Sequence, residues 1–248
     1  MRAAVLNFET QSQVSRHNRL LGTLTGDDLG RLRPHLRRVD LAAGQCVSLL
    51  SNGHAVACFP LSLVASIVQV LDDGTRFDVG LVGSEGVLGW PSVLSFVPEP
   101  QSALVQLGGG SALAIPAEAL IAACEASPSL HVAMLRFVDS FTVQMSHTII
   151  ANLRDGIEQR LARWLLMLHD RIDGDKMAIT HGELASALHV RRASITDALH
   201  VLEGERMLRC TRGQITVRDR AGLTAVAGSS YGPAETRYRT LVGDFGKV

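Results

Sequence analysis

The spacing of hydrophobic and polar residues changes twice along the chain. Leucines recur at helical intervals within residues 17–37, where Thr25-Gly26-Asp27-Asp28 is typical of a helix start. From residue 39 to residue 116, short runs of Val, Leu and Ile alternate with Gly, Asp, Asn and Pro, which indicates many short strands. Helical spacing returns at residue 117. We therefore predict short helices, then a sandwich or jelly-roll-like barrel, then further helices.

A β-hairpin is the most specific local prediction in the strand-rich region. Residues 63–71 and 75–81 both have the composition of strands, and Asp72-Asp73-Gly74 between them is a tight-turn sequence. A second turn, Gly108-Gly109-Gly110, leads into a strand over residues 111–116.

A long helix is predicted from the Ser127-Pro128 start signal to about residue 152. Its apolar residues recur at intervals of four, three, four and four positions: Leu130, Met134, Phe137, Phe141 and Met145. The stripe is narrow and the opposite face is polar, so we expect two copies of this helix to pair in a homodimer. The alternative is that the stripe packs on the chain's own barrel.

The segment after this helix has the pattern of a helix-turn-helix. A helix over about residues 155–171 comes first, and Thr180 with Glu183 three positions later forms a capping box at the start of a shorter helix. His189-Val190 is the turn, and a second helix begins near Arg191. Residues 207–217 alternate like two strands around Thr211-Arg212-Gly213, which predicts a β-hairpin wing.

The polar residues of this segment suit DNA. Arg191, Arg192 and Ser194 occupy the first turn of the second helix, where an arginine can donate two hydrogen bonds to guanine in the major groove. Arg212 at the wing tip is placed for a backbone phosphate. The alternative is two packed helices in a domain that does not bind DNA, with the arginines simply solvated.

Composition changes this interpretation little. Residues 1–128 carry 8 basic and 11 acidic side chains, a net charge of −3, and residues 129–248 carry 16 and 13, a net charge of +3. A nucleic acid would therefore dock on the second half. The four cysteines lack the spacing of metal-ligand pairs, and we expect buried reduced thiols, no metal and a cytoplasmic protein: Cys46, Cys58, Cys124 and Cys210. No signal peptide or membrane span is expected.

Together these features resemble the Crp/Fnr family of bacterial transcription regulators over nearly the whole length, including Arg160-Leu161-Ala162-Arg163-Trp164-Leu165. The resemblance implies an α+β fold. A double-stranded β-helix of the cyclic-nucleotide-binding type would occupy residues 1–127, a dimerisation helix residues 128–153, and a winged helix-turn-helix residues 154–248. It also implies double-stranded DNA as partner, and RNA polymerase if the protein is an activator.

The resemblance assigns roles within the helix-turn-helix and departs from the family elsewhere. Arg192 falls on the family's guanine-reading arginine, and Thr180 and His181 fall on phosphate-contacting positions. Ala193 and Asp197 replace a base-reading glutamate and a second arginine of the cAMP-receptor branch. The operator sequence of that branch therefore does not transfer to this chain.

The expected effector site is degenerate. Gly83–Gly89 only loosely resembles the family's cyclic-nucleotide cassette, and Gln101-Ser102-Ala103 stands where the cassette has Arg-Ser/Thr-Ala. Glutamine cannot supply the charge that a buried phosphate requires. We therefore expect no cAMP binding, and we expect Glu85 to cap a turn. The effector is another ligand or none.

Three further functions remain as alternatives. The first is a small-molecule-binding regulator of the same fold. The second is a haem sensor, with His54 near Cys58 as conceivable ligand; clustered N-terminal cysteines for an iron–sulfur centre are lacking. The third is a cupin-like enzyme, which would need clustered histidines, yet residues 55–116 contain none. The leading hypothesis is a DNA-binding regulator without catalytic residues or cofactor.

Overall fold

The first half of the chain forms a β-roll of two antiparallel sheets. This computed structural model describes residues 17–48, 50–51, 54–96 and 102–247. Within them each sheet of the roll has four strands, ordered β1-β8-β4-β3 and β2-β7-β5-β6. The strand bounds are β1 Arg37–Leu41, β2 Cys46–Ser48, β3 Leu50–Ser51, β4 His54–Pro60, β5 Ala65–Val70, β6 Arg76–Val82, β7 Ser102–Val105 and β8 Gly110–Pro116. The strand-rich barrel predicted from the sequence is confirmed.

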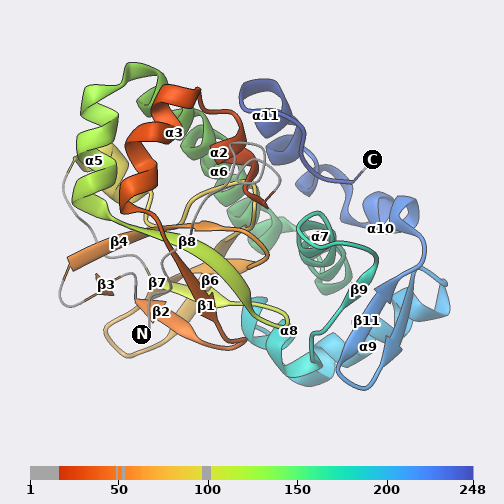
Figure 1. Cartoon of the computed structure of the whole chain (residues 1–248). Coiled ribbons are helices and arrows are strands. Elements are labelled where there is room, and N and C mark those ends of the chain that lie inside the picture. The colour runs from red at the N-terminus through yellow and green to blue at the C-terminus, as the bar shows by residue number, and fades with distance from the viewer. Residues whose placement is uncertain (1–16, 49, 52–53, 97–101, 248) are drawn as a thin grey trace.

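Short helices cover one end of the roll, at the top left of Figure 1. They are α2 (Arg19–Gly22), α3 (Gly26–Leu32), the 3₁₀ turn η1 (Arg33–His35), α4 (Pro91–Ser95) and α5 (Ala117–Ala126). As predicted, Thr25 caps α3, and its hydroxyl accepts a hydrogen bond from the Asp28 amide at 3.2 Å. The Asp28 carboxylate accepts hydrogen bonds from the hydroxyls of Ser127 at 2.5 Å and Ser129 at 2.8 Å. This carboxylate therefore joins the start of α3 to the start of the long helix.

The predicted hairpin is also confirmed. Strands β5 and β6 pair antiparallel, with Val70 opposite Arg76 at the turn. Gly74 has a φ of +81°, a conformation that side-chain-bearing residues rarely adopt, and the Asp73 carboxylate accepts a hydrogen bond from the Thr75 amide at 2.8 Å.

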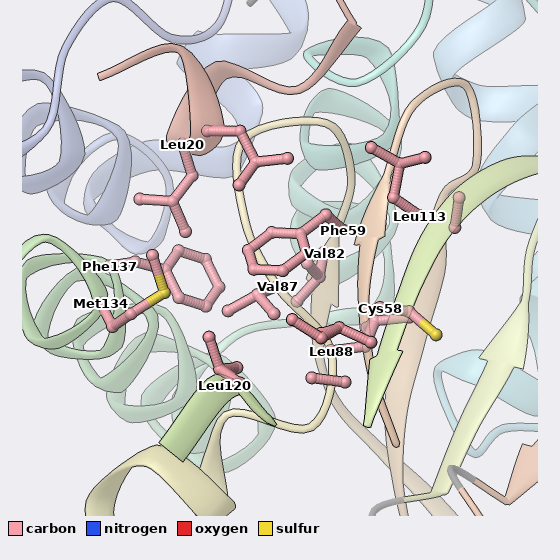
Figure 2. Close-up of a cluster of buried hydrophobic side chains, with 14 of the residues drawn as sticks. Leu20, Cys58, Phe59, Val82, Val87, Leu88, Leu113, Leu120, Met134 and Phe137 are labelled. Carbon is pink, nitrogen blue, oxygen red and sulfur yellow. The ribbon is translucent and has the colours of Figure 1, made fainter. Parts of the chain in front are cut away.

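The long helix α6 spans Pro128–Arg154, two residues beyond the predicted end. The structure corrects the role given to its apolar stripe. Leu130, Met134, Phe137 and Phe141 are at most 2% exposed within a single chain and belong to the core of the roll, and Met145 packs against that core. Figure 2 shows Met134 and Phe137 among the side chains of the roll. The stripe is therefore not a dimer interface, and the alternative of packing on the chain's own barrel is the one observed.

The close approach of α6 to the roll depends on a glycine. A Cβ atom placed on Gly86 would lie 2.1 Å from the Phe137 ring, well inside van der Waals contact. The missing side chain lets the Phe137 ring reach the loop that follows β6. The sequence spacing alone carried no information on which surface the stripe would meet.

The second half of the chain forms a separate cluster of buried residues around α7 (Ile157–His169). Around it lie α8 (His181–Ala187), α9 (Arg192–Gly204) and α10 (Arg220–Ala227), with a three-stranded sheet of β9 (Lys176–Met177), β10 (Leu208–Thr211) and β11 (Gln214–Val217). Val64 and Leu81 of the roll are part of this second cluster. Among the described helices, none combines the length and the apolar character needed to cross a membrane.

The last residues return to the roll, which the sequence did not predict. After the turn η2 (Gly228–Ser230), helix α11 (Pro233–Leu241) packs along α6, and Figure 1 places it beside α2 and α6 rather than beside the winged domain. The Arg237 guanidinium donates to the Asp139 carboxylate at 2.5 and 3.2 Å, and the Tyr238 hydroxyl donates to the Glu85 carbonyl at 2.7 Å. Residues 228–247, the C-terminal segment, therefore bridge the two halves of the molecule.

A buried ion pair lies under this segment. Arg171, just after α7, donates from Nε to the Glu85 carboxylate at 2.9 Å, and the two side chains are 1% and 3% exposed. The same guanidinium donates to the carbonyls of Met167 at 2.7 Å and Leu81 at 3.1 Å. The Phe245 ring lies 4.9 Å from the guanidinium carbon and covers it. The pair thus connects the roll to the second half in a site where both side chains are almost fully buried.

Arg171→Met is expected to lower the free energy of unfolding by about 3–5 kcal/mol, because the Glu85 carboxylate would remain buried without its partner. The double variant Glu85→Gln with Arg171→Met should recover part of the loss, since no charge is then buried. The control is Arg38→Met, which removes the exposed 3.7 Å pair with Asp40 and should cost at most about 1 kcal/mol. Urea denaturation measures all three. Equal losses for Arg171→Met and Arg38→Met would contradict this account.

Candidate nucleic-acid interface

The first helix of the predicted helix-turn-helix begins as expected. The Thr180 hydroxyl accepts a hydrogen bond from the Glu183 amide at 3.2 Å, and the Glu183 carboxylate accepts one from the Thr180 amide at 2.7 Å. This reciprocal capping box satisfies two amides that the first turn of α8 leaves without helical partners. It fixes where α8 starts and holds Thr180 and His181 at the end of the helix.

The turn and the second helix also follow the prediction. His189 has a φ of +53°, which reverses the chain after α8, and Arg191 caps α9 with extended backbone. The inner face of the pair is buried, with the side chains at most 8% exposed: Leu184, Ala185, Ile195, Leu199 and Leu202. Other positions of the two helices, such as Gly182, Ser186 and Asp197, are exposed and lie away from this buried face.

The structure brings most of the predicted DNA-binding residues to one surface. Arg191 and Arg192 are exposed at the start of α9, and Ser194 is half-buried behind them. His181 Nδ1 lies 3.0 Å from the Thr196 hydroxyl, which ties the start of α8 to the second turn of α9. The sequence analysis missed Thr196. Its position four residues after Arg192, on the same helical face, was the available signal.

The wing forms as predicted, with one additional strand. Strands β10 and β11 pair antiparallel around Gly213, whose φ is +71°, and Arg212 is exposed at the tip. Strand β9 adds to the free edge of β11, and two residues are too short a segment for strand spacing to show in a sequence. Arg212 thus stands on a rigid hairpin, apart from the residues of α9.

Helix α7 contacts the helix-turn-helix through Arg160, in the segment that carried the family resemblance. Arg160 donates from Nη2 to the carbonyl of Leu188, at the end of α8. Arg163 is buried, donates to the carbonyls of Ser230 at 2.8 Å and Gln144 at 3.2 Å, and has a pKa lowered to about 10 by burial. Arg160 thus connects α7 to the end of α8, whereas Arg163 connects α7 to α6 and to the turn η2.

The carboxylate of Glu85, in the degenerate cassette, binds groups of the protein itself. Its carboxylate accepts hydrogen bonds from the Gly83 amide at 3.0 and 3.1 Å, as expected for a turn cap, and it pairs with Arg171. The cavity beside it is only about 10 Å³, the size of one water molecule. Ser102 is half-buried at the start of β7, and Gln101 lies outside the described residues.

The conceivable haem ligands do not form a site. His54 is exposed and lies 3.4 Å from Glu118, whereas Cys58 is buried in the roll, where desolvation raises its thiol pKa to about 12. Figure 2 shows Cys58 among the core side chains. In the described part of the chain, three or more His, Cys, Asp or Glu side chains nowhere gather closely enough to hold a metal ion.

Comparison with known proteins agrees with this architecture. Residues 159–226 match the family model of the Crp-like helix-turn-helix domain. No curated protein sequence matches the chain.

Solved structures match over most of the chain at low sequence identity. A CRP-family transcriptional regulator from Thermus thermophilus is 18% identical with a TM-score of 0.61, covering 79% of this chain and 99% of its own. FixK2 from Bradyrhizobium japonicum is 15% identical with a TM-score of 0.63, covering 78% and 98%. The c-di-GMP-responsive regulator CLP from Xanthomonas campestris is 15% identical with a TM-score of 0.60, covering 78% and 99%. The chain therefore has the fold of the Crp/Fnr transcription regulators, and its residues 159–226 are a Crp-like helix-turn-helix domain.

Proposed function

We propose that this protein is a sequence-specific DNA-binding transcription regulator that acts as a homodimer on a near-palindromic site. The observation that carries the proposal is the pair of exposed arginines in the first turn of α9, on a capped helix-turn-helix with a wing. This turn is the part of a recognition helix that reaches base edges in the major groove.

The side chains divide by the part of DNA that each would contact. Arg192 reads guanine through two parallel hydrogen bonds to O6 and N7. Arg191, Ser194, Thr180 and His181 surround it and bind backbone phosphates, and Arg212 does so from the wing. Such phosphate contacts position the protein, whereas Arg192 supplies sequence preference.

The dimer contact lies on the face of α6 opposite to the buried stripe. Apolar side chains remain exposed there, including Val132 (45%), Leu135 (37%), Ile149 (60%) and Leu153 (84%). Val132 and Leu153 are three heptads apart, and Leu135 and Ile149 are two heptads apart, which is the a and d pattern of a coiled-coil seam. The middle of the seam is polar, and Asp139 is bound there by Arg237, so the contact is concentrated at the Ile149 and Leu153 end.

Control by cAMP is not part of the proposed function. The Glu85 carboxylate is paired with Arg171 and the adjoining cavity measures only about 10 Å³, so a nucleotide would have to break a buried ion pair to enter. The fold itself allows other effectors, since CLP is described as c-di-GMP-responsive. RNA polymerase is the further partner if the protein activates transcription.

Arg192→Ala is expected to weaken binding to the preferred site by about 1–3 kcal/mol per half-site and to relax the preference for guanine at one position. In a dimer the loss occurs twice, so specific affinity should fall by about 10² or more. The control is Arg212→Ala, which should weaken specific and non-specific DNA alike. Fluorescence anisotropy on the consensus site and its single-base variants measures both. If the Arg192→Ala variant keeps full discrimination between bases at every position, Arg192 does not read a base, and we would assign that role to Arg191.

The double variant Ile149→Glu with Leu153→Glu is expected to yield a folded monomer at micromolar concentration, because like charges would face each other across the seam. Phe137→Glu should instead unfold the roll, since it buries a charge in the core. The control is Val201→Glu on α9, an equally apolar site that is 47% exposed and off the seam. Sedimentation velocity separates these results. If the unmodified protein sediments as a monomer, the proposed dimer is wrong.

Titration calorimetry with cAMP is expected to show no binding at micromolar concentrations, with or without Gln101→Arg. The reason is that the Glu85 carboxylate is already paired and buried, so restoring an arginine at position 101 does not free it. Micromolar affinity in the unmodified protein would show that the Arg171–Glu85 pair opens readily.

A further inference from the structure

The β5–β6 hairpin of the roll lies against the helix-turn-helix. The Phe77 ring packs on the His189 ring, with 4.4 Å between centroids, so the strand after the hairpin turn contacts the turn between α8 and α9. Next to this contact is an open groove of about 660 Å³. One wall consists of three residues of the hairpin, and the other of residues from α8, the turn and the start of α9. The lining residues are Gly74, Thr75, Arg76, Gly182, Ala185, Ser186, His189, Val190, Arg191 and Arg192.

The groove gathers positive charge from both halves of the molecule. Arg76, Arg191 and Arg192 all line it and all are exposed. Within the residues that the structure describes, none of the three guanidinium groups donates a hydrogen bond or lies in an ion pair, and Asp78 is the acidic side chain that interacts with Arg76 over a longer range. Neither Asp nor Glu lines the groove, and the Asp73 carboxylate is turned to the Thr75 amide.

Another basic groove shows the contrast. Arg220, Arg239 and Lys247 line a groove of about 620 Å³ near the C-terminus. There Arg220 is paired with Asp170 at 2.6 Å, Lys247 lies 3.9 Å from Asp175, and Glu235 lines the same wall. Its charge is neutralised by the protein, whereas the charge of the hairpin groove is left for a partner.

We propose that the β5–β6 hairpin is part of the DNA-binding surface, with Arg76 binding a backbone phosphate of the duplex that α9 reads. The inference rests on the proposed function and adds to it a contact from the roll. An exposed, unpaired guanidinium beside two others has the chemistry that a phosphate oxygen requires, and a duplex offers phosphates at regular intervals on both sides of the major groove. The Phe77–His189 contact keeps Arg76 beside the start of α9, which sets which phosphate it reaches.

The test is Arg76→Ala, measured by anisotropy over a range of salt concentrations on consensus and unrelated duplexes. A phosphate contact carries no sequence information, so affinity for both duplexes should fall by the same factor and discrimination should not change. The slope of log affinity against log salt should decrease by about 0.9 per half-site, or about 1.8 for the dimer. Arg76→Lys should keep most of the slope, because the positive charge is retained.

The matched control is Arg31→Ala, an exposed arginine on α3, which Figure 1 places at the opposite end of the roll from α8. It should leave both affinity and salt slope unchanged. Two results would overturn the inference: an unchanged slope for Arg76→Ala, or a gain in affinity, which would mean that the hairpin screens α9. If Arg192→Ala still loses discrimination in the same experiment, only the role of the hairpin fails. If the unmodified protein binds neither duplex at low salt, the proposed function fails with it.

Discussion

The buried ion pair between Arg171 and Glu85 determines how the two halves of this molecule meet. Neither charge could remain in that site alone, because the desolvation of an unpaired buried ion costs several kcal/mol. The pair therefore requires the end of α7 and the loop after β6 to stay together. Two residues of the C-terminal segment lie against it: the Tyr238 hydroxyl donates to the Glu85 carbonyl, and the Phe245 ring covers the Arg171 guanidinium.

The same ion pair lies at the position of the expected effector site. The position that the family resemblance gives to an effector-binding carboxylate holds Glu85, and here that carboxylate stabilises the contact between the roll and the second half. The last residues of the chain, beyond the part that matches the Crp-like domain, fill the adjoining space. The Glu85 carboxylate is thus bound within the protein, by the Gly83 amide and by Arg171. Its winged domain is held in one orientation by the protein's own side chains.

The packing of the roll against the second half also determines where positive charge gathers on the proposed DNA surface. The chain has no net formal charge, so attraction to a polyanion depends on where its cations are concentrated and on which of them are unpaired. The buried guanidinium groups of Arg163 and Arg171 donate to carbonyls and a carboxylate of the protein. The exposed ones at the start of α9 and on the β5–β6 hairpin do not, and the contact between Phe77 and His189 brings them to one groove.

The elements with local signals can be predicted from the amino-acid sequence alone. The capping box at Thr180, the Asp-Gly turn of the hairpin and the glycine at the wing tip each act within a few residues, so they can be read without a fold. Which surface each element packs on depends instead on contacts between residues that are far apart in the chain. The stripe on α6 has the same spacing whether it faces a barrel or a second helix. It can pack on the roll because Gly86 has no side chain and leaves room for the Phe137 ring. Likewise Glu85 and Arg171 are 86 residues apart, and no local sequence pattern indicates that they pair. Residues 228–247 return to the roll for the same reason, since their contacts are with residues distant along the chain.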